Sequence, residues 1–512
     1  MSFRTSVFSG VLALCAAPAF ADVKAADVWD QWSALATAFG YELSALPVRE
    51  GLALTVPDAT LTRQMPNDPE TGAPGGSITM TLGRMRLVER GDGTVEVEFP
   101  GSLPVSVTMD GPQREKATAS GAVTAQGYGM IVSGTPADTV YDLKADEIGL
   151  NFDKIETFGA DPVTAAVNVT LDGTAGTTTI RMGDIATVAR DLTVAAARYS
   201  VDIPPPAGKS VRTRLEGMSE GLKMSFAAEL PTTVAADDVP AYLAGGYSLS
   251  GTLDLGSGTS QLVVEDADET LQVALARQSG GVDVSVSQDG IVYDGRAEGL
   301  NISASGGKLP LPVSTTMSSV ALGLTAPAAA GPDQDFGLRL NLAELVLPEL
   351  LWAMLDPEGA LDHEPVSAEL DLSGKAEMFV SLMDPQAQQS LDPTGKAPGA
   401  IGSLTLNKLA LQAAGAHIGA DADVAVDHSA RSVFDPKLPA FGATANLRLT
   451  GVTDLVERLA RMGLIPGGPA LVGVAMIRQL GKVETGPDDL SAEIIVSPSG
   501  AVTVNGTPLP LK

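Results

Sequence analysis

Apolar and polar residues alternate with a period of two through most of this 512-residue chain. The pattern is clearest in Ile78–Leu82, Val95–Phe99 and Val105–Met109, and the hairpin signal Gly91–Gly93 separates the first two blocks. Such alternation gives a strand one apolar and one polar side. Turn residues recur at the short spacing expected of all-β proteins, and no βαβ alternation is present. The sequence therefore predicts a mainly β protein with long antiparallel meander sheets, curved or packed as a sandwich.

A few segments change to helical periodicity. Residues 27–39 place aromatic and aliphatic side chains on one stripe and are followed by Gly40, a typical residue for ending a helix. A second short helix is predicted over 348–355, with proline at its start. Further helical structure is predicted over 454–480, with Asp454 as the capping residue. These amphipathic helices are expected to dock on the ends of the sheet.

The first residues have the features of a secretory leader. A short apolar run, Val7–Ala17, is followed by small residues at Ala19 and Ala21, the pattern that a signal peptidase requires. We therefore expect residues 1–21 to be a signal peptide, the mature chain to begin at Asp22, and the protein to reside in the periplasm of a Gram-negative envelope.

The single cysteine, Cys15, lies inside this leader and raises the alternative of a lipoprotein. Lipid attachment requires a small residue before the cysteine, and Leu14 occupies that position. Without the leader the chain has no cysteine, so we expect neither disulfides nor a thiolate metal site.

The net charge of −29 disfavours nucleic acid and anionic membrane surfaces as partners. Beyond the leader, no apolar stretch reaches the roughly 18 residues of a transmembrane helix. No motif indicates a cofactor. The partner is unknown from sequence, and a lipid or an envelope protein are the two candidates.

Composition changes divide the mature chain into three segments. They are a β-rich half with a leading helix at 22–203, a central β-rich segment at 204–330, and a β-rich half with helices at 331–512. A weak internal repeat relates Val140–Asp146 to Val292–Glu298, and chance similarity is the alternative explanation.

Catalytic motifs occur only in part. Gly217–Gly221 matches a nucleophile elbow, but a strand pattern follows where the elbow needs a helix. Ala207–Ser210 matches the end of a phosphate-binding loop, but three prolines stand before it. The histidines, His363, His417 and His428, lack the spacing of metal ligands. The sequence predicts no catalytic residue and no metal site.

Three segments together resemble an uncharacterised alphaproteobacterial family of exported proteins, number 2125 among the domains of unknown function. They are residues 28–43 (VWDQWSALATAFGYEL), Leu347–Gly374 and Gly500–Leu511. The resemblance implies no catalytic residue and no ligand. The long run of amphipathic strands is similar in texture to envelope proteins of the AsmA type, whose curved sheets are linked to lipid handling, and this similarity is a fold analogy only.

Two non-enzymatic hypotheses follow, and a hydrolase is the least favoured alternative. In the first, the protein is an interaction or assembly factor that binds through sheet edges or through the helices at 27–39 and 348–355. In the second, an apolar groove binds or transfers a lipid or another amphiphile. The candidate groove residues are Ile78, Met80, Leu82, Val95, Val97 and Phe99. Apolar strand faces open to solvent would favour the groove, and faces sealed by a second sheet would favour the interaction module.

Overall fold

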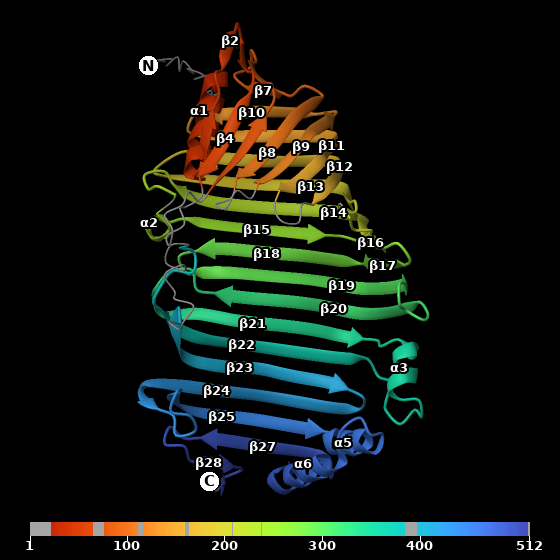
Figure 1. The fold of residues 1–512 in the computed structure, drawn as a ribbon. Coiled ribbons are helices and arrows are strands. Elements are labelled where there is room, and N and C mark those ends of the chain that lie inside the picture. The colour runs from red at the N-terminus through yellow and green to blue at the C-terminus, as the bar shows by residue number, and fades with distance from the viewer. Residues whose placement is uncertain are drawn as a thin grey trace, which may run out of the picture.

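A computed structural model describes residues 22–64, 76–110, 116–158, 163–206, 208–236, 238–384 and 397–509. The fold is mainly β, with 63% strand and 11% helix, and confirms the predicted antiparallel meander. All strands of these described ranges belong to a single sheet. Figure 1 shows the strands stacked one after another from the N-terminal to the C-terminal end of the molecule.

The helices are α1 (Ala25–Ala38), α2 (Val239–Ala244), α3 (Glu349–Leu355), α5 (Val452–Arg461) and α6 (Gly467–Leu480). The first strands are β1 (Glu42–Ser44), β2 (Val48–Glu50), β3 (Ala53–Val56), β4 (Ala59–Gln64), β5 (Ser77–Leu82), β6 (Met85–Glu89), β7 (Val95–Glu98), β8 (Ser102–Asp110), β9 (Lys116–Gln126) and β10 (Gly129–Thr135). The central strands are β11 (Asp138–Phe158), β12 (Thr164–Arg181), β13 (Ile185–Ile203), β14 (Arg212–Pro231), β15 (Ser248–Leu255), β16 (Gly258–Glu265), β17 (Thr270–Arg277), β18 (Ser279–Ser287), β19 (Gly290–Gly306) and β20 (Val313–Ala326). The last strands are β21 (Gly331–Leu345), β22 (Val366–Met378), β23 (Gly399–Ala413), β24 (Ala416–Arg431), β25 (Pro439–Thr450), β26 (Lys482–Val483), β27 (Asp489–Val496), β28 (Val502–Val504) and β29 (Thr507–Leu509).

Several shorter strands are the two halves of one long strand. β9 and β10 both pair with β11 in one continuous register, with Gln126 opposite Glu147 and Gly129 opposite Lys144. In the same way β15 and β16 pair with β14, and β17 and β18 pair with β19. The middle of the molecule is therefore a simple meander of long strands, each interrupted near its centre.

The interruptions align across the sheet. Pairing is skipped where Asp146 faces Gly173, where Gly173 faces Ala195, and where Ala195 faces Gly221. The same line continues to Gly299 in β19. We call this line the crease, and it divides the sheet into two arms. The first arm is the side that contains β9, β16 and β17, and the second arm is the side that contains β10, β15 and β18.

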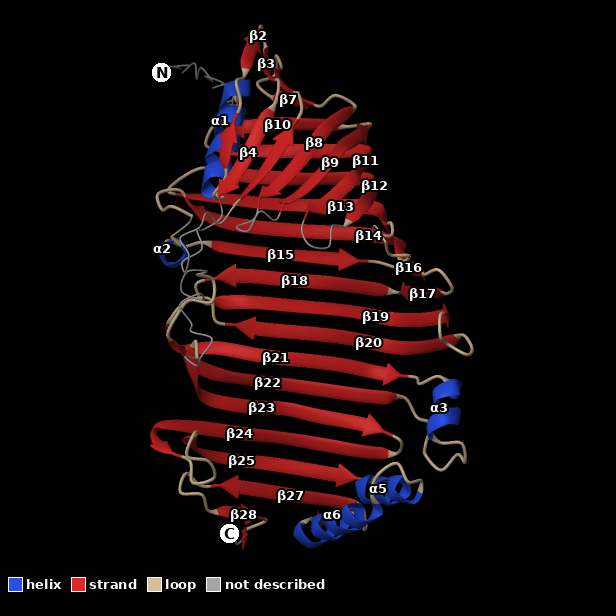
Figure 2. Ribbon diagram, in the orientation of Figure 1, coloured by secondary structure: helices blue, strands red, loops and turns tan. Residues whose placement is uncertain are grey.

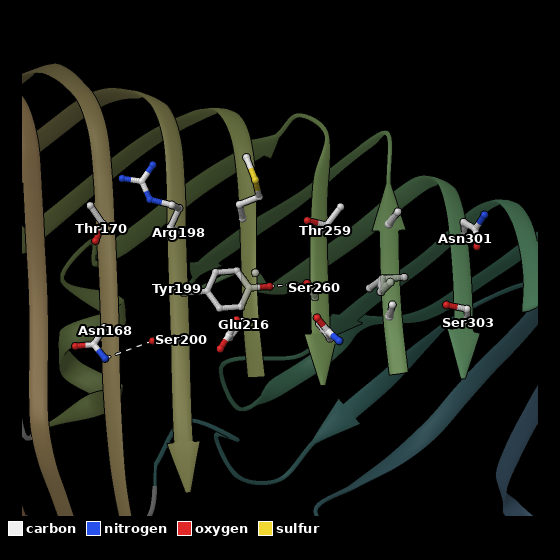
Figure 3. Close-up of a pocket in the computed structure, with 16 residues that line it drawn as sticks. Asn168, Thr170, Arg198, Tyr199, Ser200, Glu216, Thr259, Ser260, Asn301 and Ser303 are labelled. Atoms are coloured by element: carbon white, nitrogen blue, oxygen red, sulfur yellow. Dashed lines mark hydrogen bonds between the residues drawn. The ribbon is translucent and has the colours of Figure 1, made fainter. Parts of the chain in front are cut away.

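Left-handed backbone geometry marks the crease at several strands. Gly127, Gly173, Gly221 and Gly299 have φ values of 58°, 59°, 61° and 59°, which glycine adopts without a steric penalty. Across the crease in β13, Val194 and Ala197 are both buried, so the apolar side changes from even to odd residue numbers. The pairing register is the same on both sides of the crease, so no strand gains or loses a residue there. Figure 3 shows the strands of this region arching over sharply.

At the N-terminal end the sheet separates into two limbs that both start from β11. One limb continues through β10, β7, β6, β3 and β2, and the other through β9, β8, β5, β4 and β1. Helix α1 lies against these strands, as Figure 2 shows. Trp29 and Trp32 of α1 pack against the buried clusters of both limbs. The predicted N-terminal helix is confirmed, and it holds the two limbs together.

Polar contacts fix the position of α1. The Trp32 Nε1–H donates a hydrogen bond to Tyr141 Oη at 3.2 Å, and Tyr141 Oη donates to Gln31 Oε1 at 2.6 Å. Thr139 Oγ1 also donates to Gln31 Oε1, at 2.9 Å. Gln31 is almost fully buried, so these bonds offset part of the free energy lost when its amide leaves water.

The later predicted helices are also confirmed, as α3, α5 and α6. The predicted cap of α5 differs, because the helix begins earlier and Asp454 lies in its first turn. Asp488 provides the cap instead, accepting hydrogen bonds from the N–H groups of Thr453 and Asp454, each at 3.1 Å. A capping residue so distant in sequence leaves no local signal.

The predicted segment boundaries fall within the continuous sheet. The boundary after residue 203 lies in the connection between β13 and β14, which pair from Ile203 opposite Thr213 to Ile185 opposite Pro231. The boundary after residue 330 lies between β20 and β21, which also pair with each other.

The left-handed geometry at the crease predicts that replacing Gly221 destabilises the protein. A Cβ there would touch nothing within 4 Å, so Gly221→Ala adds only the penalty of left-handed geometry. We expect the free energy of unfolding to fall by about 1 kcal/mol in urea denaturation. The matched control is Gly419→Ala in β24, which also has open space but lacks positive φ. Equal losses in both variants would contradict the assigned role of Gly221.

Candidate functional site

The side of the sheet on which α1 packs is apolar over its whole length, and we call it the inner face. Residues are assigned to this face from the pairing register of the strands and from contacts with α1. On the second arm, Val188, Phe226 and Leu253 lie on this face in β13, β14 and β15. On the first arm, it carries Val169 of β12 and Leu275 of β17 in paired rows. The opposite, outer face is polar.

The inner face is closed at its N-terminal end and partly covered at its C-terminal end. At the N-terminal end, Val132 and Leu230 are fully buried among residues of α1 and its neighbours. At the C-terminal end, Met476, Ile477 and Leu480 of α6 line an apolar hollow of about 230 Å³ against β25 and β27, and Met476 keeps 54% of its surface exposed. Helices therefore cover the inner face at each end of the sheet.

The middle of the inner face is open. Leu322 and Leu324 of β20 have 41% and 47% of their surface exposed, and Leu340 of β21 has 40%. Leu411 of β23 has 39%. Leu322 pairs directly with Leu340, and the other two leucines lie in neighbouring rows of the same face. We call them the leucine stretch. Contiguous exposed apolar surface of this kind marks a binding site more often than a free surface.

The six groove residues predicted from sequence occupy different places. Val95 and Val97 are fully buried in the core beneath α1, and Phe99 packs against that core with its ring 5.1 Å from that of Tyr128. Ile78, Met80 and Leu82 are partly buried in β5, in the other limb. The structure thus assigns Val95 and Val97 to a closed core, and the open apolar surface lies at the leucine stretch instead. Sequence periodicity marks both regions equally, because it does not say what covers a strand.

The residues of the predicted cleavage site stand at the border of the described chain. Ala19 and Ala21 lie outside the described residues, and Asp22 is the first described residue. The cleavage site remains a prediction.

A shallow hollow of about 600 Å³ lies on the first arm, between β12 and β19 (Figure 3). Tyr199 lies across Gly217, where a Cβ would come within 2.4 Å of the tyrosine ring. The Tyr199 hydroxyl shares a hydrogen bond with Ser260 at 2.6 Å. Arg198 at the same hollow is already paired with Asp172, at 2.6 Å. This ion pair neutralises the charge of Arg198, so the guanidinium is not free to bind a ligand in the hollow.

The Asp356–His363 region has a structural role. Asp356 is buried and accepts hydrogen bonds from the N–H groups of Ala360 and Leu361, at 2.8 and 2.6 Å. The His363 ring stacks on Trp352 with centroids 4.2 Å apart. Burial raises the pKa of Asp356, but these hydrogen bonds outweigh it, and the net pKa is lowered. The carboxylate therefore anchors the turn after α3.

Charged side chains are separated between the two faces. The outer face carries cross-strand ion pairs, such as Arg181 with Asp138 at 3.2 Å and Lys408 with Glu369 at 2.6 Å. From β9 to β20, the described inner-face positions carry only two charged residues, Arg190 and Arg277. Arg277 Nη2 donates a hydrogen bond to Ser219 at 2.6 Å.

Within the described ranges, no group of three or more histidine, cysteine, aspartate or glutamate side chains is placed to hold a metal ion. None of the described helices is both long and apolar enough to cross a membrane. No protein-family model matches the chain, and no curated protein matches it. The resemblance to the exported family described above stays a prediction.

The open leucine stretch predicts binding of a neutral apolar dye. We expect the folded protein to enhance Nile red fluorescence, and Leu322→Glu to reduce that enhancement by at least half, because a dye bound over the carboxylate would remove that charge from water. Val292→Glu is the matched control, since Val292 is also 41% exposed but lies on the outer face. Equal dye binding by both variants would place the dye elsewhere.

Proposed function

We propose that this protein binds the acyl chains of an amphiphile along the inner face of its sheet, outside the cytoplasm. The observation that carries the proposal is the leucine stretch, which leaves large apolar side chains exposed between two ends of the sheet on which helices pack. Leaving leucine side chains exposed to water is unfavourable by about 25 cal/mol per Å² of apolar surface. An acyl chain laid on them removes this surface from water without needing a polar partner.

The dimensions of the inner face suit passage along the sheet. Strands repeat at about 4.8 Å, so the path from β13 to β27 is roughly 50 Å long. One acyl chain spans about half of the roughly 30 Å hydrocarbon core of a bilayer. Several chains could therefore follow one another, which supports transfer of a lipid rather than storage of one molecule.

The chemistry of the face supports an adaptable ligand. It is built mainly from valine, leucine and alanine, and aromatic residues make up only 4% of the chain. Neighbouring strands pair throughout the sheet except at the crease and at a few irregularities, so most backbone groups along the apolar path are hydrogen-bonded within the sheet. Selectivity for a particular acyl chain is not expected from such a surface.

A second candidate function is an interaction or assembly factor of the envelope. It is favoured by α3, where Met354 is strongly exposed and Leu355 is exposed while Trp352 is buried. The other helix predicted for this role, α1, is packed between the two limbs and offers less free surface.

The test is native mass spectrometry with lipid extraction on protein purified from a bacterial periplasm. We expect acyl lipid to co-purify in stoichiometric amount with the wild-type chain. The double variant Leu322→Glu, Leu340→Glu is expected to lose at least four fifths of it, because two carboxylates interrupt the apolar path. Val292→Glu should retain it.

A wild-type chain that carries no lipid, and takes up none from added vesicles, would contradict the proposal. Cross-linking through α3 would then become the first experiment.

A further inference from the structure

We propose that Arg190 binds the negatively charged headgroup of the amphiphile, at the closed N-terminal end of the inner face. This inference rests on the proposed function, because it identifies the class of ligand that the same face would take. The ligand class is an anionic lipid with a phosphate or carboxylate at one end of its acyl chain.

Arg190 is placed on the inner face by its register. It lies in β13 directly between Thr178 of β12 and Phe226 of β14. A cavity of about 180 Å³ adjoins it, also lined by Trp32 of α1 and by Tyr141 and Ile180. The cavity is far smaller than a whole lipid, and Arg190 is the only charged group among its lining residues.

The guanidinium of Arg190 lacks a partner within the described part of the chain. It makes no ion pair and no side-chain hydrogen bond there, although the residue is partly buried. Other arginines of the same strands differ, since Arg181 pairs with Asp138 and Arg198 with Asp172 on the outer face. A partly buried cation without a counter-ion gains from a ligand that supplies negative charge.

The surrounding groups do not supply that charge. Burial raises the pKa of Tyr141 to about 12, so its hydroxyl is neutral at physiological pH. Arg277, the other charged residue of this part of the inner face, is also positive. From β9 to β20 the described inner face thus carries only positive charge, in a protein whose net charge is −29, and this is the complement of an anionic headgroup.

The path from Arg190 leads directly to the leucine stretch. Successive paired residues connect Arg190 to Leu324 through Phe226, Gly251, Val284 and Tyr293, in one row across the strands. Five strand intervals of about 4.8 Å make this row roughly 24 Å long. A headgroup at Arg190 therefore directs its acyl chain along apolar residues toward the open leucines.

The test compares two ligands with the same 16-carbon chain, lysophosphatidic acid and the neutral monoacylglycerol, in displacement of Nile red from the purified full chain. We expect the wild type to bind the anionic ligand about tenfold more tightly, as a charge-assisted hydrogen bond provides. Arg190→Gln should remove this preference and leave monoacylglycerol binding unchanged. Arg190→Lys should keep part of the preference.

Arg181→Gln is the matched control, because it removes one positive charge from the outer face of the adjacent strand. It should leave the preference intact, and urea denaturation should show that every variant is folded. Equal binding of both ligands by the wild type, or a preference that survives in Arg190→Gln, would overturn the inference while acyl-chain binding stands. Failure of both ligands to bind would instead reject the proposed function, and the headgroup site with it.

Discussion

The organisation of this protein depends on one continuous ladder of backbone hydrogen bonds with an apolar side that no second sheet covers in the described part of the chain. In a sandwich, each apolar strand face packs on another and both disappear from water. Here helices α1 and α6 cover the two ends only. The exposure of Leu322 and Leu324 is a direct consequence, because the sheet continues beyond the reach of either helix.

The crease turns this uncovered side into a recess. Residues with left-handed geometry at several strands, such as Gly173 and Gly221, bend neighbouring strands at the same level. Glu344 of β21 has the same geometry without being glycine, and its carboxylate accepts a hydrogen bond from Ser318 of β20. A bend shared by hydrogen-bonded neighbours keeps the ladder intact on both arms while the chain changes direction.

Electrostatics follow the same division. Carboxylates and most cationic groups of the central strands face outward, where exposed ion pairs such as Arg296 with Asp254 add little stability but keep the surface hydrated. The inner face has few charges, so each one that occurs there acts in a less polar environment. This gives Arg190 more influence on a bound anion than an exposed arginine would have.

The sequence by itself determined the strands, their alternation, and the helices at α1, α3, α5 and α6, because periodicity and turn residues are local properties. It did not distinguish Val97, which is fully buried, from Leu324, which is largely open. It also missed the capping of α5 by Asp488 and the alignment of Gly173 with Ala195. Only the tertiary structure decided these features, since each depends on the register between residues far apart in the chain, and register is set by the pairing of whole strands.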